Sequence, residues 1–386
     1  MSIQPAPLAL TSRDFTFGVE FEFGIRFEKR PFKRESQIWE LVRDNLIAET
    51  GLLVRTELEM EMMDHRDEPS TTDFKATAAG KIVESESFTT WAIVTDSSVC
   101  FDEEKRKEKD HNVYYCGIEM RTPVLKFGPD ALKEINTVLT ALRKQFNVLV
   151  NRSCGLHVHV GREREGISHV PLQQLMSTIW VFESQISELL HKSRHFYYKH
   201  CALLHMRSNI GIRKVQGNIL DIMLGTSNVN DVIDIFGGYE NGVGVAYNIL
   251  DLRQPFLNPV KRTIEFRQHE GCLDPETVLN WASFLVELVA WAHRIERQDF
   301  KIFLSTYINQ KEGYSVSELF KELGLPESVL AFWRYKVAKL REAEEKEENE
   351  VEAYEDDLIP PDVSLSGDSS GSEYSGDIEF EPSPEI

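Results

Sequence analysis

Alternation of apolar and polar residues predicts a set of half-buried strands along the chain. The predicted strands cover residues 15–27, 91–95, 113–121, 156–160, 243–250 and 263–269. Successive side chains of a strand point to opposite faces, so each segment should have one apolar and one polar face. We predict that the last two segments pair with each other.

Apolar residues at steps of three and four predict long helices between these strands. The helices cover residues 36–50, 130–146, 172–190 and 275–295, and two shorter ones begin at Val316 and Glu327. Gly51 suits the end of the first helix. Strands interrupted by helices without regular βαβ alternation indicate an α+β fold. We expect a largely antiparallel sheet with helices packed on one face and a site on the other.

The polar faces of three predicted strands carry residues that bind metals. The residues expected to share a face are Glu20 with Glu22, His157 with His159, and Glu265 with Arg267 and His269. The apolar residues between them, which should face the core, are Phe21, Val158 and Phe266. Taken singly, these motifs also fit a solvated edge strand, a hydrogen-bonded histidine pair and a cross-strand ion pair. The flanking glycines favour a site, because glycine in a strand often marks a close approach of backbone or ligand; they are Gly18, Gly155, Gly161 and Gly271.

Carboxylates two residues apart on one strand need a counter-charge if both are to be ionised in a dry cleft. A divalent cation supplies that charge. Glutamate-rich ligation with one imidazole favours Mg²⁺, with Mn²⁺ as a second choice, whereas a histidine-based site would favour Zn²⁺ or Fe²⁺.

The combination of motifs resembles a known family. Gly-x-Glu-x-Glu begins at Gly18, Gly-Leu-His-Val-His at Gly155, and Arg-Thr-Ile-Glu-Phe-Arg-x-His at Arg262. With Trp91…Asp96-Ser97-Ser98, the strand Glu119-x-x-Thr-Pro and the pair Tyr247-Asn248, they are similar to the amidoligase family over roughly residues 15–295. This family comprises carboxylate–amine ligases of the glutamine synthetase and glutamate–cysteine ligase superfamily.

The resemblance implies a role for each matching residue. Metal ligands would be Glu20, Glu22, Glu119, His157 and Glu265. Nucleotide contacts would come from Arg267, with Arg262, Arg207 and Asn248 as further candidates. Catalytic roles would fall to Arg267, Glu265, His159 and His269, with His159 orienting a ligand from outside the metal's own shell.

The resemblance also implies a glutamine synthetase-like catalytic domain and an ATP- and Mg²⁺-dependent reaction. A small-molecule or peptide carboxylate would be activated as an acyl phosphate, and an amine would then form the amide bond. Two alternatives stay open. One is an inactive descendant of the fold that binds or scaffolds a partner, and the other is a His/Glu metalloenzyme that does not use ATP.

Charge and composition place further limits on function. Residues 341–386 hold 17 acidic and two basic residues, so they carry −15 of the net charge of −20. We therefore expect a catalytic domain over residues 1–345 and a disordered acidic tail over 346–386. The remaining acidic body argues against nucleic-acid binding. No run of about 18 apolar residues predicts a membrane span. Five scattered cysteines without a Cys-x-x-Cys pair, and no secretory signal, predict a cytoplasmic protein. A homo-oligomer is compatible with the sequence, which does not specify one.

Overall fold

The structure is a computed structural model. It describes residues 10–64, 88–109, 112–194, 201–212, 218–238, 245–255, 261–308 and 314–356, with side chains as far as residue 346. The chain divides into two compact units, Met1–Arg341 and Glu342–Ile386. Every residue discussed as part of a site lies in the first unit.

Nine strands of the described residues form one sheet. They are β1 (Thr16–Phe27), β2 (Val54–Thr56), β3 (Trp91–Val94), β4 (Tyr114–Arg121), β5 (Leu125–Lys126), β6 (Val148–Leu149), β7 (Gly155–Gly161), β8 (Tyr247–Asn248) and β9 (Thr263–Glu270). Their order is β2-β3-β4-β1-β7-β9-β8, and β5 and β6 each pair with β1. Only β2 and β3 run parallel, so the sheet is mixed and mostly antiparallel.

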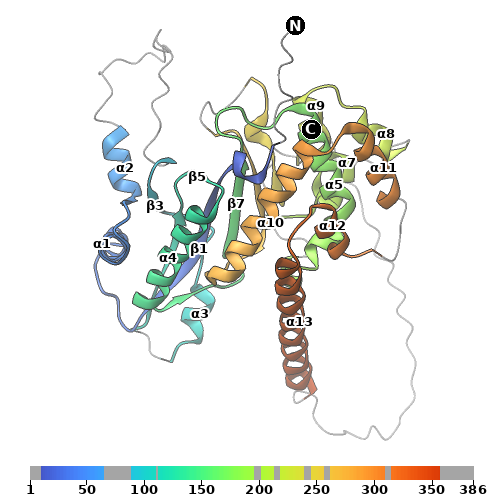
Figure 1. Cartoon of the computed structure of the whole chain (residues 1–386). Coiled ribbons are helices and arrows are strands. Elements are labelled where there is room, and N and C mark those ends of the chain that lie inside the picture. Colours follow the sequence, from blue (N-terminus) through green and yellow to red (C-terminus); the bar gives the residue numbers. More distant parts are fainter. Residues whose placement is uncertain are drawn as a thin grey trace, which may run out of the picture. The chain divides into compact units, whose positions relative to one another are not determined.

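Helices fill most of the remaining described chain. They are α1 (Ser36–Thr50), α2 (Glu57–Asp64), α3 (Asp102–Lys107), α4 (Pro129–Gln145), α5 (His169–Ser187), α6 (Leu204–Arg207), α7 (Asn209–Ile212), α8 (Ile219–Leu224), α9 (Val229–Phe236), α10 (Pro275–Arg294), α11 (Arg297–Ile308), α12 (Val316–Glu322) and α13 (Glu327–Asp356). Short 3₁₀ helices cover Ser12–Asp14, Lys192–Arg194 and Leu250–Leu252. In Figure 1, α4 and α10 lie side by side across β1 and β7, and α4 also packs on α1 while α10 packs on α5. None of the described helices combines the length and apolar composition that a membrane crossing requires.

The α+β class and the long elements predicted from the sequence are confirmed. The helix predicted over 36–50 is α1, and Gly51 follows it in the left-handed conformation with φ of 71°. The predicted pairing of the last two strands is confirmed between β8 and β9, although β8 is shorter than predicted and residues 243–244 lie outside the described residues. The strands β2, β5 and β6 and the helices α2, α3 and α11 were missed. The helix predicted from Glu327 continues to Asp356, into the segment predicted as tail, and residues 357–386 lie outside the described part of the chain.

The helical layer and the apolar strand faces form the core. Phe21, Val158 and Phe266 are at most 1% exposed, which confirms that they face it. Fully burying a side chain of this size stabilises a fold by about 1.5–3 kcal/mol. The alternation that buries these residues leaves their polar neighbours on the opposite face.

A β-bulge interrupts this alternation on β9. Val158 pairs with Phe266, yet Leu156 pairs with His269, so two residues of β9 stand opposite His157 alone. An extra residue inverts the alternation beyond it. His269 therefore joins Leu156 on the core side, where its ring lies 5.2 Å from that of Trp281. The prediction that His269 shares a face with Glu265 and Arg267 is wrong for this reason.

Candidate active site

Strand register brings the sequence motifs together on one face of the sheet. Glu20 of β1 is directly opposite His157 of β7 and Arg121 of β4. Glu22 is opposite Glu119. Side chains opposite each other in an antiparallel pair have Cβ atoms about 5 Å apart, so these groups are in contact range.

Five carboxylates occupy this face, and we call them the acid row: Glu20, Glu22, Asp96, Glu119 and Glu265. Two sets of side chains in it are close enough to share a cation. Glu20, His159 and Glu265 form one set, and the other set is Glu22, Asp96 and Glu119. Within each set the potential ligand atoms lie within 4.8 Å of one another.

The first set is organised around Glu20. Its Oε1 lies 3.1 Å from Nε2 of His159, and that nitrogen lies 3.8 Å from Oε1 of Glu265. Oε2 of Glu265 accepts a hydrogen bond of 3.0 Å from the Asn248 amide on the neighbouring strand. Asn248 thus fixes a carboxylate of the set. His159 was predicted to orient a ligand from outside the metal's own shell. In the structure its ring nitrogen lies within the first set, where it could itself be a ligand.

His157 lies between the two sets. Its Nδ1 is 3.3 Å from Oε2 of Glu20 and 3.8 Å from Glu265, while its Nε2 is 3.6 Å from Glu22. The ring fits because residue 155 is a glycine: a Cβ there would lie 2.6 Å from Nε2 of His157. The Gly155 N–H also donates a 2.6 Å hydrogen bond to Glu22.

Two arginines contact the acid row from its sides. Arg121 donates to Glu119 and lies 3.4 Å from Oε1 of Glu20. Arg267 donates a 2.5 Å hydrogen bond to Oε1 of Glu265. Five carboxylates thus meet two guanidinium groups, which leaves an excess of acidic groups on a buried face.

Burial and neighbouring charges separate the pKa values of these carboxyl groups. Burial raises the pKa of Glu119 to about 8, and the nearby Glu20 adds to this effect. Burial also raises the pKa of Glu22. Burial opposes ionisation of Glu265 as well, but His159 and Arg267 outweigh it and lower its pKa to about 2. His159 and His157 likewise hold the pKa of Glu20 well below its usual value despite burial.

The donor set fits a divalent cation. His159 is only 8% exposed, and its Nε2 makes no hydrogen bond although it lies among carboxylate oxygens. A buried nitrogen without a hydrogen bond is costly, and coordination of a cation would satisfy it. The first set offers two carboxylates and one imidazole and the second set only carboxylates, a donor composition that suits Mg²⁺ or Mn²⁺.

Two cavities adjoin the row at different residues. One, of about 200 Å³, is bordered by Glu20 and His159 and by three basic side chains, Arg121, Lys261 and Arg262; we call it the Arg262 cavity. The other, of about 680 Å³, includes Asp96, and we call it the Asp96 cavity. A small void of about 10 Å³ is lined by Glu22 and His157 and by the two arginines Arg194 and Arg267.

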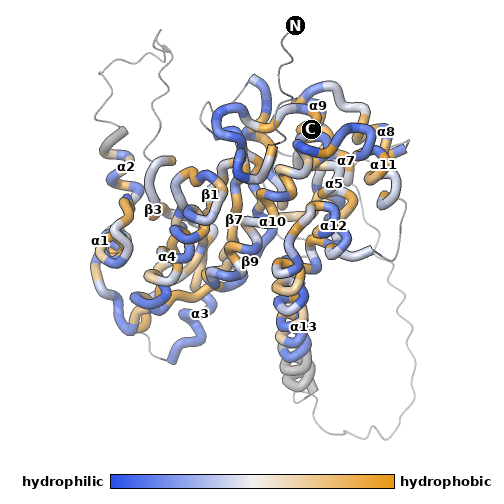
Figure 2. Tube along the Cα trace, in the orientation of Figure 1, coloured by the Kyte–Doolittle hydropathy of each residue, from blue (hydrophilic) through white to orange (hydrophobic). Residues whose placement is uncertain are grey.

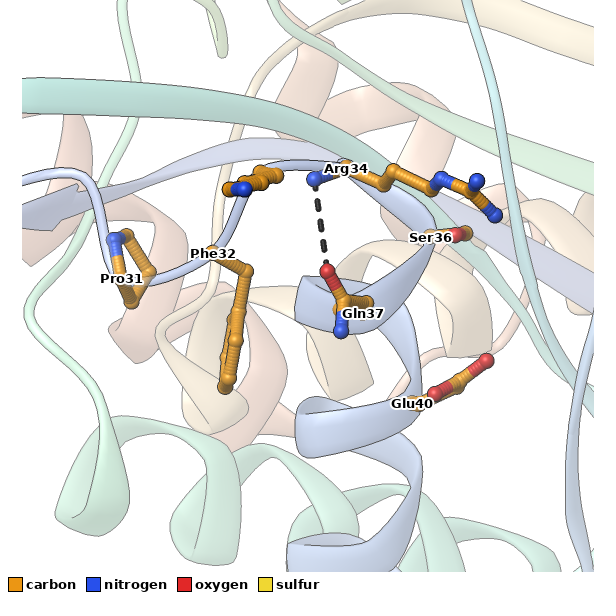
Figure 3. A pocket seen from close by; sticks show the side chains of 7 residues that line it. Pro31, Phe32, Arg34, Ser36, Gln37 and Glu40 are labelled. Carbon is orange, nitrogen blue, oxygen red and sulfur yellow. Dashed lines mark hydrogen bonds between the residues drawn. The ribbon is translucent and has the colours of Figure 1, made fainter.

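A further recess lies away from this face. It has about 550 Å³ and is formed by the loop before α1 and the first turns of that helix, where Gln37 accepts a hydrogen bond from the Arg34 N–H (Figure 3). No residue of the acid row lines it.

The structure thus brings together most of the residues predicted for the site. Glu20, Glu22, Glu119, His157, His159, Glu265, Arg267 and Asn248 lie in or against the acid row. Arg262 lines the adjoining cavity, whereas Arg207, at the end of α6, lines neither cavity.

Sequence reasoning assigned no role to four residues at this site, one of which is Lys261, directly before the motif that begins at Arg262. Asp96 lies in a motif quoted for its resemblance, and Arg121 ends the strand that carries Glu119. Their positions within those motifs were the available signal. Arg194 is buried in the 3₁₀ helix after α5, and no sequence pattern marked it.

Comparison with known proteins identifies the family of the chain. The family model described as "Putative amidoligase enzyme" matches residues 13–289, and the chain belongs to this family. No curated protein matches the chain.

Among solved structures, the chain is similar to a bifunctional glutathione synthetase from Pasteurella multocida, with 11% sequence identity and a TM-score of 0.36. The match covers 86% of this chain and 48% of that protein, so the chain spans about half of its length.

Proposed function

We propose that the chain is an ATP- and Mg²⁺-dependent ligase that joins a carboxylate to an amine through an acyl phosphate. The observation that carries this proposal is the acid row, in which five buried or half-buried carboxylates surround His157 and His159 on one sheet face. Mg²⁺ in proteins is typically bound by carboxylates together with substrate phosphates. The proposed fold relationship is to the catalytic domain of glutamine synthetase, and it rests on the strand motifs.

The proposed reaction has two steps. A carboxylate oxygen of the first substrate attacks the γ-phosphorus of ATP, which gives an acyl phosphate and releases ADP. The amine nitrogen then attacks the acyl carbon, so that the amide forms, phosphate leaves and the nitrogen loses a proton. Bound divalent cations would neutralise the crowded negative charge of the phosphates.

The side chains of the row divide into ligands and supports. Glu20, His159 and Glu265 would hold one cation, and Glu22, Asp96 and Glu119 a second. His157 touches both sets, so it is either a ligand or a bridge that holds them in register. Asn248 fixes Glu265 through its amide.

Basic residues on two sides of the row suit the phosphates. Arg267 pairs with Glu265 and would meet a phosphate oxygen from β9. The Arg262 cavity adds Arg121, Lys261 and Arg262 beside Glu20. We therefore propose that the triphosphate approaches the cations from this cavity.

The test is a thermal-shift titration with a non-hydrolysable ATP analogue, with and without Mg²⁺, on the full chain. A ligand that binds only the folded state stabilises it by about 2.7 kcal/mol at one hundred times its Kd. We expect an upward shift in Tm that needs Mg²⁺ and that Glu20→Gln abolishes. The matched control is Glu28→Gln, just beyond β1, where the side chain is 81% exposed and the shift should persist.

Two outcomes would overturn this proposal. The first is a cooperatively folded protein that does not respond to the analogue with Mg²⁺ or Mn²⁺. The second is a response that Glu20→Gln leaves unchanged, because the nucleotide would then bind away from the acid row.

A further inference from the structure

The Asp96 cavity lies where the sheet edge is open. Strand β3 pairs only with residues 119–121 of β4, so among the described strands none pairs with the first half of β4 on that side. The cavity occupies this place, between the start of β4, the start of α1 and helix α3. Its volume of about 680 Å³ is typical of a small-molecule site.

Four aromatic side chains line this cavity: Trp39, Phe101, Tyr114 and Tyr115. The rings of Phe101 and Tyr115 are parallel within 5°, with centroids 5.9 Å apart. Phe101 takes this position over Gly24 of β1, where a Cβ would lie 2.5 Å from its ring. The four rings thus form an aromatic wall around the sheet edge, in which Phe101 and Tyr115 lie on the face of the acid row and Tyr114, next to Tyr115 on β4, points to the opposite face.

The charged residues that line the cavity are mostly acidic. They are Glu35, Asp96 and Asp102, against the single cation Lys105. Helix α3, which supplies Asp102 and Lys105, is hydrophilic along its whole length (Figure 2). Nearby, the guanidinium of Arg30 lies 5.1 Å from the centre of the Tyr114 ring, so an aromatic ring of this wall already holds a cation. This lining contrasts with the three basic side chains of the Arg262 cavity.

Asp96 belongs to both the cavity and the acid row. It lines the cavity, and its carboxylate is within 4.8 Å of ligand atoms of Glu22 and Glu119. A molecule held in the cavity therefore has one end next to the candidate cation site. The Arg262 cavity likewise adjoins the first set, because Glu20 and His159 of that set line it.

We infer that the Asp96 cavity binds the amine substrate, and that this substrate is a protonated amine with an aromatic or aliphatic body. The inference rests on the proposed ligase function. Aromatic faces bind apolar bodies and attract cations, and the surrounding carboxylates favour a positive charge. Phosphate groups are excluded from this cavity by the same acidic lining that attracts an amine. The ammonium group would first give one proton to a carboxylate of the site, and the freed nitrogen lone pair would then attack the activated carboxylate beside Asp96.

The experiment measures binding of 2-phenylethylamine to the full chain by calorimetry, in the presence of Mg²⁺ and the ATP analogue. The uncharged 2-phenylethanol is the matched ligand. The test variant is Glu35→Gln with Asp102→Asn, which leaves Asp96 intact. Its control is Asp221→Asn with Asp299→Asn, which removes two other exposed charges, from α8 and α11.

We expect the amine to bind at least tenfold more tightly than the alcohol. Because Glu35 and Asp102 are exposed, their loss should weaken amine binding only about five- to tenfold. The control variant should bind like the native protein. All three proteins should bind the nucleotide analogue equally.

Each other outcome gives a definite answer. Nucleotide binding without amine binding, or equal binding of amine and alcohol, overturns the inference and leaves the ligase proposal intact. Loss of amine binding in the control variant as well would also overturn it, because bulk charge would then explain the effect. Amine binding that needs Glu35 and Asp102, in a protein that binds no nucleotide, supports the cavity assignment and refutes the ligase proposal.

Discussion

The close fit of His157 against Gly155 gives a sharp test of how the site is built. In Gly155→Ala the new Cβ would lie 2.6 Å from Nε2 of His157 and 3.3 Å from Nη2 of Arg194. Both of these residues are at most 5% exposed, so neither side chain can move freely into solvent. The imidazole must leave its position between Glu20 and Glu22.

The expected cost follows from two opposing effects. Overpacking a well-packed interior typically costs about 1–3 kcal/mol. Replacing glycine by alanine also restricts the unfolded chain, which offsets about 0.4–1 kcal/mol. We therefore expect Gly155→Ala to lower the free energy of unfolding by about 1–2 kcal/mol. The measurement is urea unfolding of the first unit, followed by fluorescence. If the slope m is the same for both proteins, the shift of the urea midpoint gives the change in the free energy of unfolding.

Gly18→Ala is the matched control on β1. There a Cβ would lie 3.5 Å from Oγ1 of Thr122, an ordinary contact, so stability should be unchanged or slightly higher. A double variant that adds His157→Ala to Gly155→Ala removes the clashing ring. The double variant should therefore be more stable, by about 1–2 kcal/mol, than the sum of the two single effects on the free energy of unfolding predicts. Equal stability of the two single glycine variants, or additivity in the double variant, would refute this account of the His157 position.

Two further predictions concern a metal support and a helix cap. Asn248→Ala removes the hydrogen-bond donor to Glu265, so it should weaken Mg²⁺ binding by about tenfold or more in a calorimetric titration. The urea midpoint should change little. An unchanged Mg²⁺ affinity would contradict the supporting role of Asn248. Asp274→Ala removes the 3.0 Å cap to the Thr277 N–H at the start of α10 and should cost about 1 kcal/mol in urea unfolding near neutral pH. Burial favours the protonated form of Asp274, but the hydrogen bonds from Thr277 outweigh this effect and lower its pKa in the folded state. The stabilisation by Asp274 is therefore present above its unfolded-state pKa and is lost as pH falls through its folded-state pKa. A difference between native and variant protein that stays constant into acid would contradict the cap assignment.

The face on which each motif residue lies could be predicted because alternation along a strand fixes it. Glu20 and Glu22 on one side of β1, with Phe21 on the other, needed only the period of two. The register between strands was not visible in the sequence. That Glu20 meets His157 and Glu22 meets Glu119 depends on how distant segments pair.

Residues outside regular strands could not be placed in the same way. Asp96 follows β3 in a loop, and its approach to Glu22 and Glu119 depends on where that loop returns over the sheet. The β9 bulge was equally hidden, because no glycine or proline interrupts residues 263–270. His269 was misplaced for that reason alone, since a single extra residue reverses every later side chain.

The side chain of Arg194 stabilises the bulge on β9. A bulge leaves backbone groups without ladder partners, and buried carbonyls need donors. The Arg194 guanidinium lies 2.9 Å from the carbonyl oxygen of His269, 3.2 Å from that of Gln268 and 3.4 Å from that of Arg267, and it donates to all three. A buried arginine from the segment after α5 thus replaces the missing strand contacts. The position of Arg267 beside Glu265 therefore depends on a side chain more than 70 residues earlier, which neither the alternation of β9 nor its motif reveals.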